Sequence, residues 1–221
     1  MIAYNAQLIS VALEIILNIK ERMSDIIRTE AEAIQNIHVT DDFEKAVNLM
    51  LACTGKIITT GMGKAGYIAN KFASTMASTG TPAFFIHPAE AGHGDMGMIS
   101  DHDLIIAFST SGKSIEVLEM LENASHLGVR EIIGITSHVD SPLRQHSQLI
   151  LDMGAEIKEA CPLQLAPSAT IAVMLAISDA LALTLMELKG FTSEQYGMRH
   201  HKGYLGSITR EQHKYDNEVD L

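Results

Sequence analysis

Residues 103–114 read DLIIAFSTSGKS, an apolar run followed at once by a turn of hydroxyl groups, glycine and lysine. The run over 103–108 is typical of a buried strand, and apolar residues recur at helical spacing through 115–127. The first N–H groups of a helix are unpaired and the helix dipole is positive there, so this turn can bind an anion. We expect a phosphate monoester, although serines also cap helices with nothing bound. The expected binding residues are Ser109, Thr110, Ser111 and Ser114.

A second glycine turn follows the predicted strand at 56–60. It reads GMGKAG over 61–66 and matches the dinucleotide pattern G-x-G-x-x-G, which also serves plain strand-to-helix packing. A nucleotide-binding fold needs an acidic residue at the end of the next strand, and only Glu90 stands near that position. The 103–114 turn is no Walker A loop, because Ala107 stands where that motif needs glycine. Two anion-competent turns without a complete nucleotide motif predict a small phosphorylated metabolite as ligand.

Three further segments accompany these two turns. They are ASTMASTGTP at 73–82, HPAEAGHGD at 87–95 and KEACPLQLAP at 158–167. In order and spacing the five segments resemble the sugar isomerase (SIS) domain family, and within it the D-arabinose 5-phosphate isomerases. The resemblance implies an aldose–ketose isomerase that interconverts D-arabinose 5-phosphate and D-ribulose 5-phosphate through an enediol, without a cofactor.

The resemblance also implies the residues of the site. The implied catalytic residues are Lys64, His93, Glu116, Glu159 and His200, and Gly61 and Gly63 join the four hydroxyl residues as substrate-binding positions. Lys64 would hold the phosphate or the enediolate, and Glu159 is favoured as the base that moves the proton between C1 and C2. His200 would open the sugar ring or shuttle protons, because imidazole groups titrate near neutral pH.

Simpler interpretations of these residues remain open. Lys64 can be a solvated surface lysine, and His93 can be an ordinary hydrogen-bonding loop residue. A glutamate such as Glu116 is favoured in the first turn of a helix by the dipole alone. Ten histidines invite a metal site, but none of them forms a metal-binding motif, so we expect no metal.

Some positions depart from the family pattern. Lys113 replaces a glutamate that is common in longer members, while His201 and Lys202 replace a proline and a glycine beside His200. These changes bear on substrate choice more than on fold. Many relatives also carry a tandem CBS pair after the SIS domain, and the sequence implies the shorter form without that pair.

Composition excludes several classes of protein. The net charge of −11 argues against binding to nucleic acid, which needs a basic surface. Two cysteines cannot form a disulfide scaffold and suit a cytoplasmic protein, with Cys161 expected as a small buried residue. No run of 18 apolar residues is present, so no membrane span is expected.

The alternation of apolar runs and helical patterns predicts an α/β fold, a doubly wound five-stranded parallel sheet with N-terminal helices. We expect an N-terminal helical segment at 1–36, a SIS domain at 37–206 and a polar tail at 207–221. The predicted strands lie near 56–60, 82–86, 103–108, 131–136 and 148–153, and the main helices near 64–79, 114–127, 168–189 and 193–200.

An apolar stripe along 3–36, which includes Leu8, Val11, Ala12, Ile15 and Ile19, predicts a surface that packs on a partner subunit or covers the sheet. The resemblance adds a homo-oligomer, a tetramer, in which His200 reaches a neighbouring site. Two other functions stay open, an isomerase of a hexulose 6-phosphate or heptulose 7-phosphate and a non-catalytic regulator that binds phosphosugars. The presence of Lys64, Glu159 and His200 together favours an enzyme, because a sensor needs no base.

Overall fold

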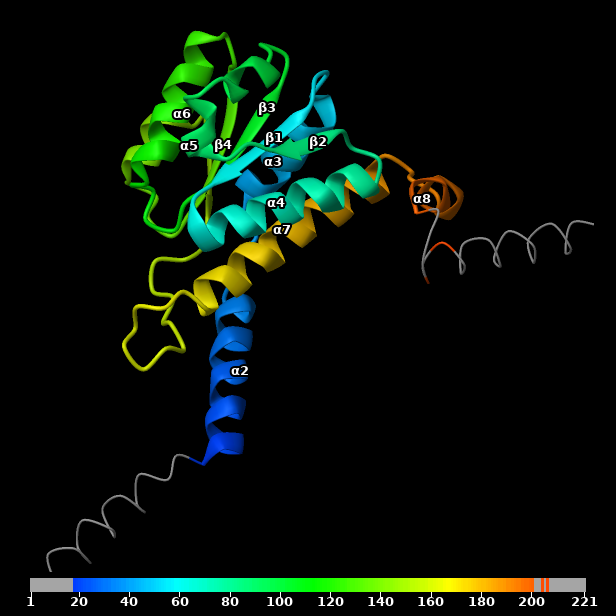
Figure 1. Ribbon diagram of the computed structural model, residues 1–221. Helices are drawn as coiled ribbons and strands as arrows, with labels where there is room; N and C mark the ends of the chain where they lie inside the picture. Colours follow the sequence, from blue (N-terminus) through cyan, green and yellow to red (C-terminus); the bar gives the residue numbers. More distant parts are fainter. Residues whose placement is uncertain (1–17, 201–203, 205, 207–221) are drawn as a thin grey trace, which may run out of the picture.

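The computed structural model describes residues 18–200 together with Tyr204 and Gly206. In that part of the chain a parallel sheet lies between two layers of helices (Figure 1). The helices are α2 (Ile19–Gln35), α3 (Asp41–Ala52), α4 (Gly63–Ser78), α5 (Pro88–Ala91), α6 (Ile115–His126), α7 (Ala169–Leu188) and α8 (Ser193–Arg199). Two short 3-10 helices, η1 (Asp95–Met98) and η2 (Pro142–His146), complete the list.

The sheet contains five parallel strands in the order β2-β1-β3-β4-β5. The strands are β1 (Ile57–Gly61), β2 (Ala83–Phe85), β3 (Leu104–Phe108), β4 (Glu131–Thr136) and β5 (Leu149–Asp152). From β1 the chain moves outward to β2 and then returns to β3 on the other side of β1, so the direction of winding reverses there. The predicted doubly wound fold is confirmed, and its switch point lies between β1 and β3.

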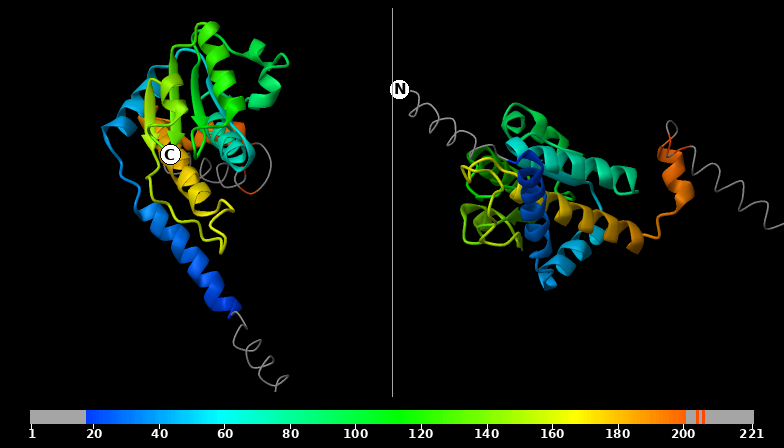
Figure 2. Two further views of the ribbon diagram at one scale, coloured as in Figure 1. Left: turned by 90° about the vertical axis from the view of Figure 1, so that its left-hand side faces the viewer. Right: turned by 90° about the horizontal axis from the view of Figure 1, so that it is seen from below.

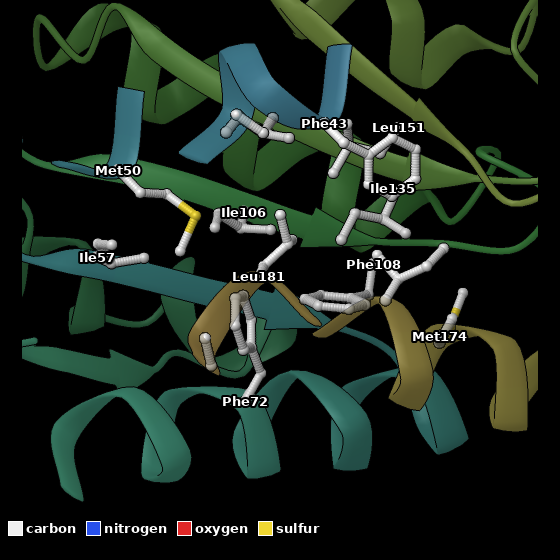
Figure 3. Close-up of a cluster of buried hydrophobic side chains, with 14 of the residues drawn as sticks. Phe43, Met50, Ile57, Phe72, Ile106, Phe108, Ile135, Leu151, Met174 and Leu181 are labelled. Carbon is white, nitrogen blue, oxygen red and sulfur yellow. The ribbon is translucent and has the colours of Figure 1, made fainter. Parts of the chain in front are cut away.

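Each face of the sheet has its own apolar core. The larger core is formed by α3, α4 and α7, where Phe72 of α4 meets Phe108 of β3 edge to face at 5.9 Å between ring centroids (Figure 3). Buried residues of α4 recur at Ala69, Phe72, Ala73 and Met76, which is the spacing of one helix face. The second core lies under α6, whose Val117, Met120, Leu121 and Ala124 cover the other face.

The N-terminal helix α2 extends away from these layers (Figures 1 and 2). None of its residues is buried, and Ile19, Met23 and Ile27 form an apolar row on it that is 58–70% exposed. Part of the predicted stripe is therefore present on α2, while its members between 3 and 17 lie outside the described residues. The next helix, α3, has Thr40 as its N-cap residue, whose side chain makes no capping hydrogen bond.

Helix α7 is the one helix of the described chain that is long and apolar enough to cross a membrane by length and composition. Half of its most apolar window is buried inside the protein, and it packs beside α4 and α3 in the larger core. These contacts are those of the core helix of a folded domain, which passes the same length and composition test.

A buried carboxylate, that of Asp103, lies at the amino-terminal edge of the sheet. Asp103 is 2% exposed and accepts hydrogen bonds from the backbone N–H groups of Lys56 at 2.7 Å and Ser100 at 2.8 Å. Burial raises the pKa of Asp103, but these hydrogen bonds and the nearby Lys56 ammonium lower it by more, so its pKa lies below the ordinary value. The ionised form is therefore the one that supports the fold.

We expect Asp103→Asn to lower the free energy of unfolding by about 1–3 kcal/mol at pH 7, because a buried N–H group loses its acceptor. Since the folded pKa lies below the unfolded one, the contribution of Asp103 is present above the unfolded pKa and fades as the pH falls below it. Urea unfolding at pH 7 and at acid pH measures both effects. The exposed neighbour Asp101 provides the control, and an equal loss in Asp101→Asn would contradict the prediction.

Candidate phosphosugar site at the switch point

Both glycine turns lie at the carboxyl edge of the sheet, on adjacent strands. Gly61 at the end of β1 pairs with Phe108 at the end of β3, so the turns that follow are neighbours. Each turn leads into a helix, α4 or α6, whose first N–H groups face the same edge. Ligands of doubly wound sheets bind in the crevice outside the carboxyl ends at this switch point.

Glycine is required in the first turn on two different physical grounds, close packing and backbone conformation. A side chain at Gly61 would lie 2.9 Å from the carbonyl of Phe108, and one at Gly66 would lie 2.4 Å from that of Gly61. A side chain at Gly61 would also lie 3.1 Å from the Gly66 nitrogen, so both glycines permit close packing of β1 against α4, the simpler interpretation of the motif. Gly63 has φ of +57° and open space around its missing side chain, so backbone conformation requires glycine there and a ligand can approach.

Lys64 is exposed and occupies the second position of α4, directly after Gly63. The positive end of the helix and the ammonium group therefore lie at the same point of the carboxyl edge. Such an arrangement can hold the phosphate of a sugar or a negative charge that develops on it.

The second turn is held firmly against the segment that follows β4. The carbonyl of Thr110 accepts hydrogen bonds from the Thr136 hydroxyl at 2.9 Å and from the N–H and hydroxyl of Ser137 at 3.1 and 2.9 Å. Gly112 has φ of +62°, and a side chain there would collide with Ser141. The backbone of this turn is thus preorganised, which favours binding of a small anion.

The hydroxyl groups of this turn are not used to cap α6. Ser114 is the N-cap residue, but its hydroxyl makes no capping hydrogen bond and lies 3.1 Å from that of Ser109. Ser111 is exposed and its hydroxyl accepts the Lys113 N–H at 3.3 Å. The hydroxyl groups of Ser109 and Ser114 are therefore close together at a helix N-terminus, where they can add donors to the N–H groups that attract an anion.

Glu159 lies in the loop between β5 and α7, and its carboxylate binds the N-terminus of α7. One oxygen accepts the N–H groups of Ser168 at 2.7 Å and Ala169 at 2.8 Å, and the other accepts the Thr170 hydroxyl. Burial raises the pKa of Glu159, but the Thr170 hydroxyl and these N–H groups lower it by more. The carboxylate is consequently ionised at neutral pH and fixed in direction. The sequence singled out Glu159 but missed Thr170, because only the folded loop brings them together.

Two of the candidates lie on exposed positions at this edge. Glu116 is at the second position of α6, beside the phosphate-competent turn. His93 is on the turn between α5 and η1, where its N–H donates to the carbonyl of Glu90 at 2.9 Å. Both follow strands at the carboxyl edge, and neither has a described contact that assigns it a role.

His200 lies far from the other candidates of its own chain. It is the C-cap residue of α8, where its ring stacks on Tyr196 at 3.9 Å between centroids. Its neighbour Arg199 lines a cavity with Lys56 and Pro82, which stand at the amino edge of the sheet. Glu159 and α8 are at opposite ends of α7 (Figures 1 and 2), whose 20 residues span about 30 Å. His200 and Glu159 of one chain cannot contact the same small substrate in this arrangement.

The cysteine beside Glu159 corrects one expectation. Cys161 is partly exposed instead of buried, because the loop that carries it stands outside both apolar cores. The N–H groups of Ala166, Leu165 and Leu163 lower the pKa of its thiol.

No group of three or more histidine, cysteine, aspartate or glutamate residues in the described chain could hold a metal ion.

The fold therefore places two anion-competent turns side by side at the switch point of a parallel sheet, an arrangement typical of domains for phosphorylated small molecules. The SIS domain model matches residues 50–184, which is more than half of the chain. The chain belongs to the SIS domain family.

Relatives and solved structures place it more closely. The arabinose 5-phosphate isomerase KdsD of Pseudomonas aeruginosa is 44% identical over 179 residues, which cover 80% of this chain and 54% of KdsD. A protein of Bacteroides fragilis described as a candidate phosphosugar isomerase involved in capsule formation matches with a TM-score of 0.81, 41% identity and coverage of 85% of this chain and all of that one. An Escherichia coli CFT073 protein in complex with arabinose 5-phosphate has a TM-score of 0.80, 36% identity and coverage of 83% and 97%. The chain spans about half the length of the curated relatives that it matches.

Proposed function

We propose that the protein interconverts D-arabinose 5-phosphate and D-ribulose 5-phosphate. The observation that carries the proposal is the pair of neighbouring anion-competent turns at the switch point, with Lys64 at one and the Ser109–Ser114 hydroxyls at the other. The similarity to KdsD over 80% of the chain, and to a protein in complex with arabinose 5-phosphate, supports this sugar phosphate in particular.

In the proposed reaction the phosphate binds the N–H and hydroxyl groups of the 109–114 turn. A base removes the proton from C2 of the open-chain aldose, and the bonding electrons form the double bond of an enediolate between C1 and C2. The proton returns to C1 while the hydroxyl proton of O2 moves to O1, which yields the ketose. Lys64 stabilises the negative charge that develops on the oxygens.

Glu159 is our candidate for the base. Its lowered pKa keeps it ionised at neutral pH, so it is ready to accept a proton without prior deprotonation. The same low pKa makes it a weak base, so the reaction depends on cations and N–H groups that stabilise the enediolate. The base and Lys64 are thereby assigned complementary tasks.

We also propose that the active protein is a homo-oligomer, a tetramer, whose sites are completed by His200 of a neighbouring subunit. The separation of His200 from Glu159 along α7 supports sharing, since a second chain can bring α8 to the carboxyl edge. The exposed apolar row on α2 offers one surface for assembly.

The direct test is to incubate the purified protein with a panel of pentose, hexulose and heptulose phosphates and follow the products by NMR. We expect conversion of arabinose 5-phosphate without any added cofactor, and in deuterium oxide label should enter at C1 of ribulose 5-phosphate. Turnover of a hexulose or heptulose phosphate alone would replace the substrate assignment. Binding of phosphosugars without any turnover would instead indicate a regulator.

A further inference from the structure

The loop that carries Glu159 contains no helix or strand, so its backbone carbonyls need other partners. Three consecutive carbonyls accept hydrogen bonds from side chains. The Gln164 amide donates to the carbonyl of Glu159 at 2.8 Å and to that of Cys161 at 3.1 Å, and the Arg22 guanidinium donates to that of Ala160. Gln164 has φ of 53° and is the one described residue other than glycine with positive φ. The loop therefore holds this residue in a backbone conformation that residues other than glycine seldom adopt.

Arg22 and Gln164 lie on different parts of the fold. Gln164 belongs to the loop, whereas Arg22 projects from α2 and precedes Ala160 by 138 positions. Helix α2 runs below the N-terminus of α7 and has no buried residue (Figures 1 and 2). Toward the other end of α2, Ala33 packs against the larger core, and the Arg22 hydrogen bond connects the N-terminal part of the helix to this loop.

A short series of hydrogen bonds connects Arg22 to the Glu159 carboxylate. Arg22 holds the carbonyl of Ala160, and the N–H of Ala160 donates to the Ser168 hydroxyl at 3.2 Å. The Ser168 hydroxyl and N–H both donate to the same oxygen of Glu159, at 3.3 and 2.7 Å. Arg22 and Glu159 also line one surface cavity of about 430 Å³, so the guanidinium stands beside the loop on the side open to solvent.

We propose that Arg22 is a positioning residue for Glu159, which through the carbonyl of Ala160 holds the Glu159 carboxylate against the N-terminus of α7. The inference rests on the proposed function only in naming Glu159 as the base. It assigns the exposed helix α2 a part in the site, because α2 supplies the guanidinium that fixes this loop.

The proposal has a consequence for proton binding. The titratable or charged groups around Glu159 are Arg22 from α2 and Lys158 and Cys161 from the loop, while the first turn of α7 contributes no acidic residue. When Arg22 releases the loop, Glu159 loses part of the hydrogen bonding to α7 that holds its pKa below the ordinary value. This loss disfavours the ionised form, so the pKa of Glu159 should rise toward its ordinary value.

The test compares Arg22→Met, which keeps the unbranched stem but no donor, with Arg22→Lys, which restores a cationic donor. Arg28→Met is the matched control, because Arg28 lies on the same helix and pairs with Asp25 at 3.0 Å instead of the loop. Two quantities are measured on the full chain, the kinetic constants for arabinose 5-phosphate and the titration of the Glu159 carboxyl carbon by NMR, assigned with Glu159→Gln.

For Arg22→Met we expect kcat to fall by about 10–100-fold with KM changed less than about threefold, since misplacement of a reacting group by 1 Å costs this much. The Glu159 titration should shift to higher pH, Arg22→Lys should recover part of both effects, and Arg28→Met should match the wild type. Wild-type kcat and an unshifted titration in Arg22→Met would overturn the inference. If Arg22→Met does not fold, Arg22→Lys decides alone. A Glu159 titration shifted above that of the wild type supports the inference, and an unshifted titration overturns it.

The two measurements separate the inference from the proposed function. If the wild type turns over no sugar phosphate, the proposed function fails, but a shifted Glu159 titration in Arg22→Met still supports the positioning role. If the wild type is active and the titration does not move, the positioning role fails and the function stands.

Discussion

Replacing Lys64 with alanine should lower kcat/KM for arabinose 5-phosphate by about 10²–10³-fold, the scale for loss of one charge-stabilising donor in a reaction of this kind. Lys64 is exposed at the N-terminus of α4, so its removal should leave the thermal unfolding midpoint nearly unchanged. Steady-state kinetics at saturating and limiting substrate, with a thermal melt of each variant, measure both.

Lys71 provides the matched control for this experiment. It lies two turns further along α4 and forms an exposed ion pair with Asp179, away from the glycine turn. Exposed pairs of this type contribute little to stability, so Lys71→Ala should fold and turn over like the wild type. Unchanged kinetic constants in Lys64→Ala, or an equal loss in Lys71→Ala, would remove Lys64 from the mechanism.

Mixing two inactive variants should restore activity if sites are shared between subunits. Glu159→Gln and His200→Ala should each lose about 10²–10⁴-fold in kcat, the usual scale for an acid–base group. After random exchange, about one quarter of the sites should combine an intact Glu159 with an intact His200, because symmetric subunits contribute the two residues independently. Activity assays before and after exchange, with exchange itself followed by native mass spectrometry, measure the recovery.

A second mixture tests which residues come from one chain. Lys64 and Glu159 lie near the N-termini of α4 and α7, which pack side by side at the carboxyl edge. Mixing Lys64→Ala with Glu159→Gln should therefore restore nothing. Recovery in this mixture, or its absence in the first mixture despite proven exchange, would contradict the proposed division of the site.

The parts of the site that follow strands were predictable from sequence. A strand and the helix after it are close in the chain, so the turns at 61–66 and 109–114 are recognisable from apolar periodicity and glycine placement. The parallel arrangement then places all such turns at one edge of the sheet. The order β2-β1-β3, which makes 61–66 and 109–114 neighbours, was not readable from either turn.

The loop around Glu159 shows what local sequence cannot reveal. Nothing near Glu159 indicates that its carboxylate caps a helix that begins ten residues later. The hydrogen bond from Arg22 to Ala160 is less predictable still, since it joins residues 138 positions apart. Contacts of this kind depend on where whole elements pack, and no periodic pattern records them.

The sequence by itself determined the α/β class, the parallel strands and the two anion-competent turns of this protein. These depend on local apolar spacing and on glycines such as Gly63, whose backbone conformation few other residues adopt. Only the tertiary structure decided that Glu159 is bound to the α7 N-terminus, that Arg22 reaches its loop and that His200 stands at the other end of α7. The physical reason is that these relations arise from the packing of α2, α7 and α8 as rigid elements, which fixes distances that the chain order leaves open.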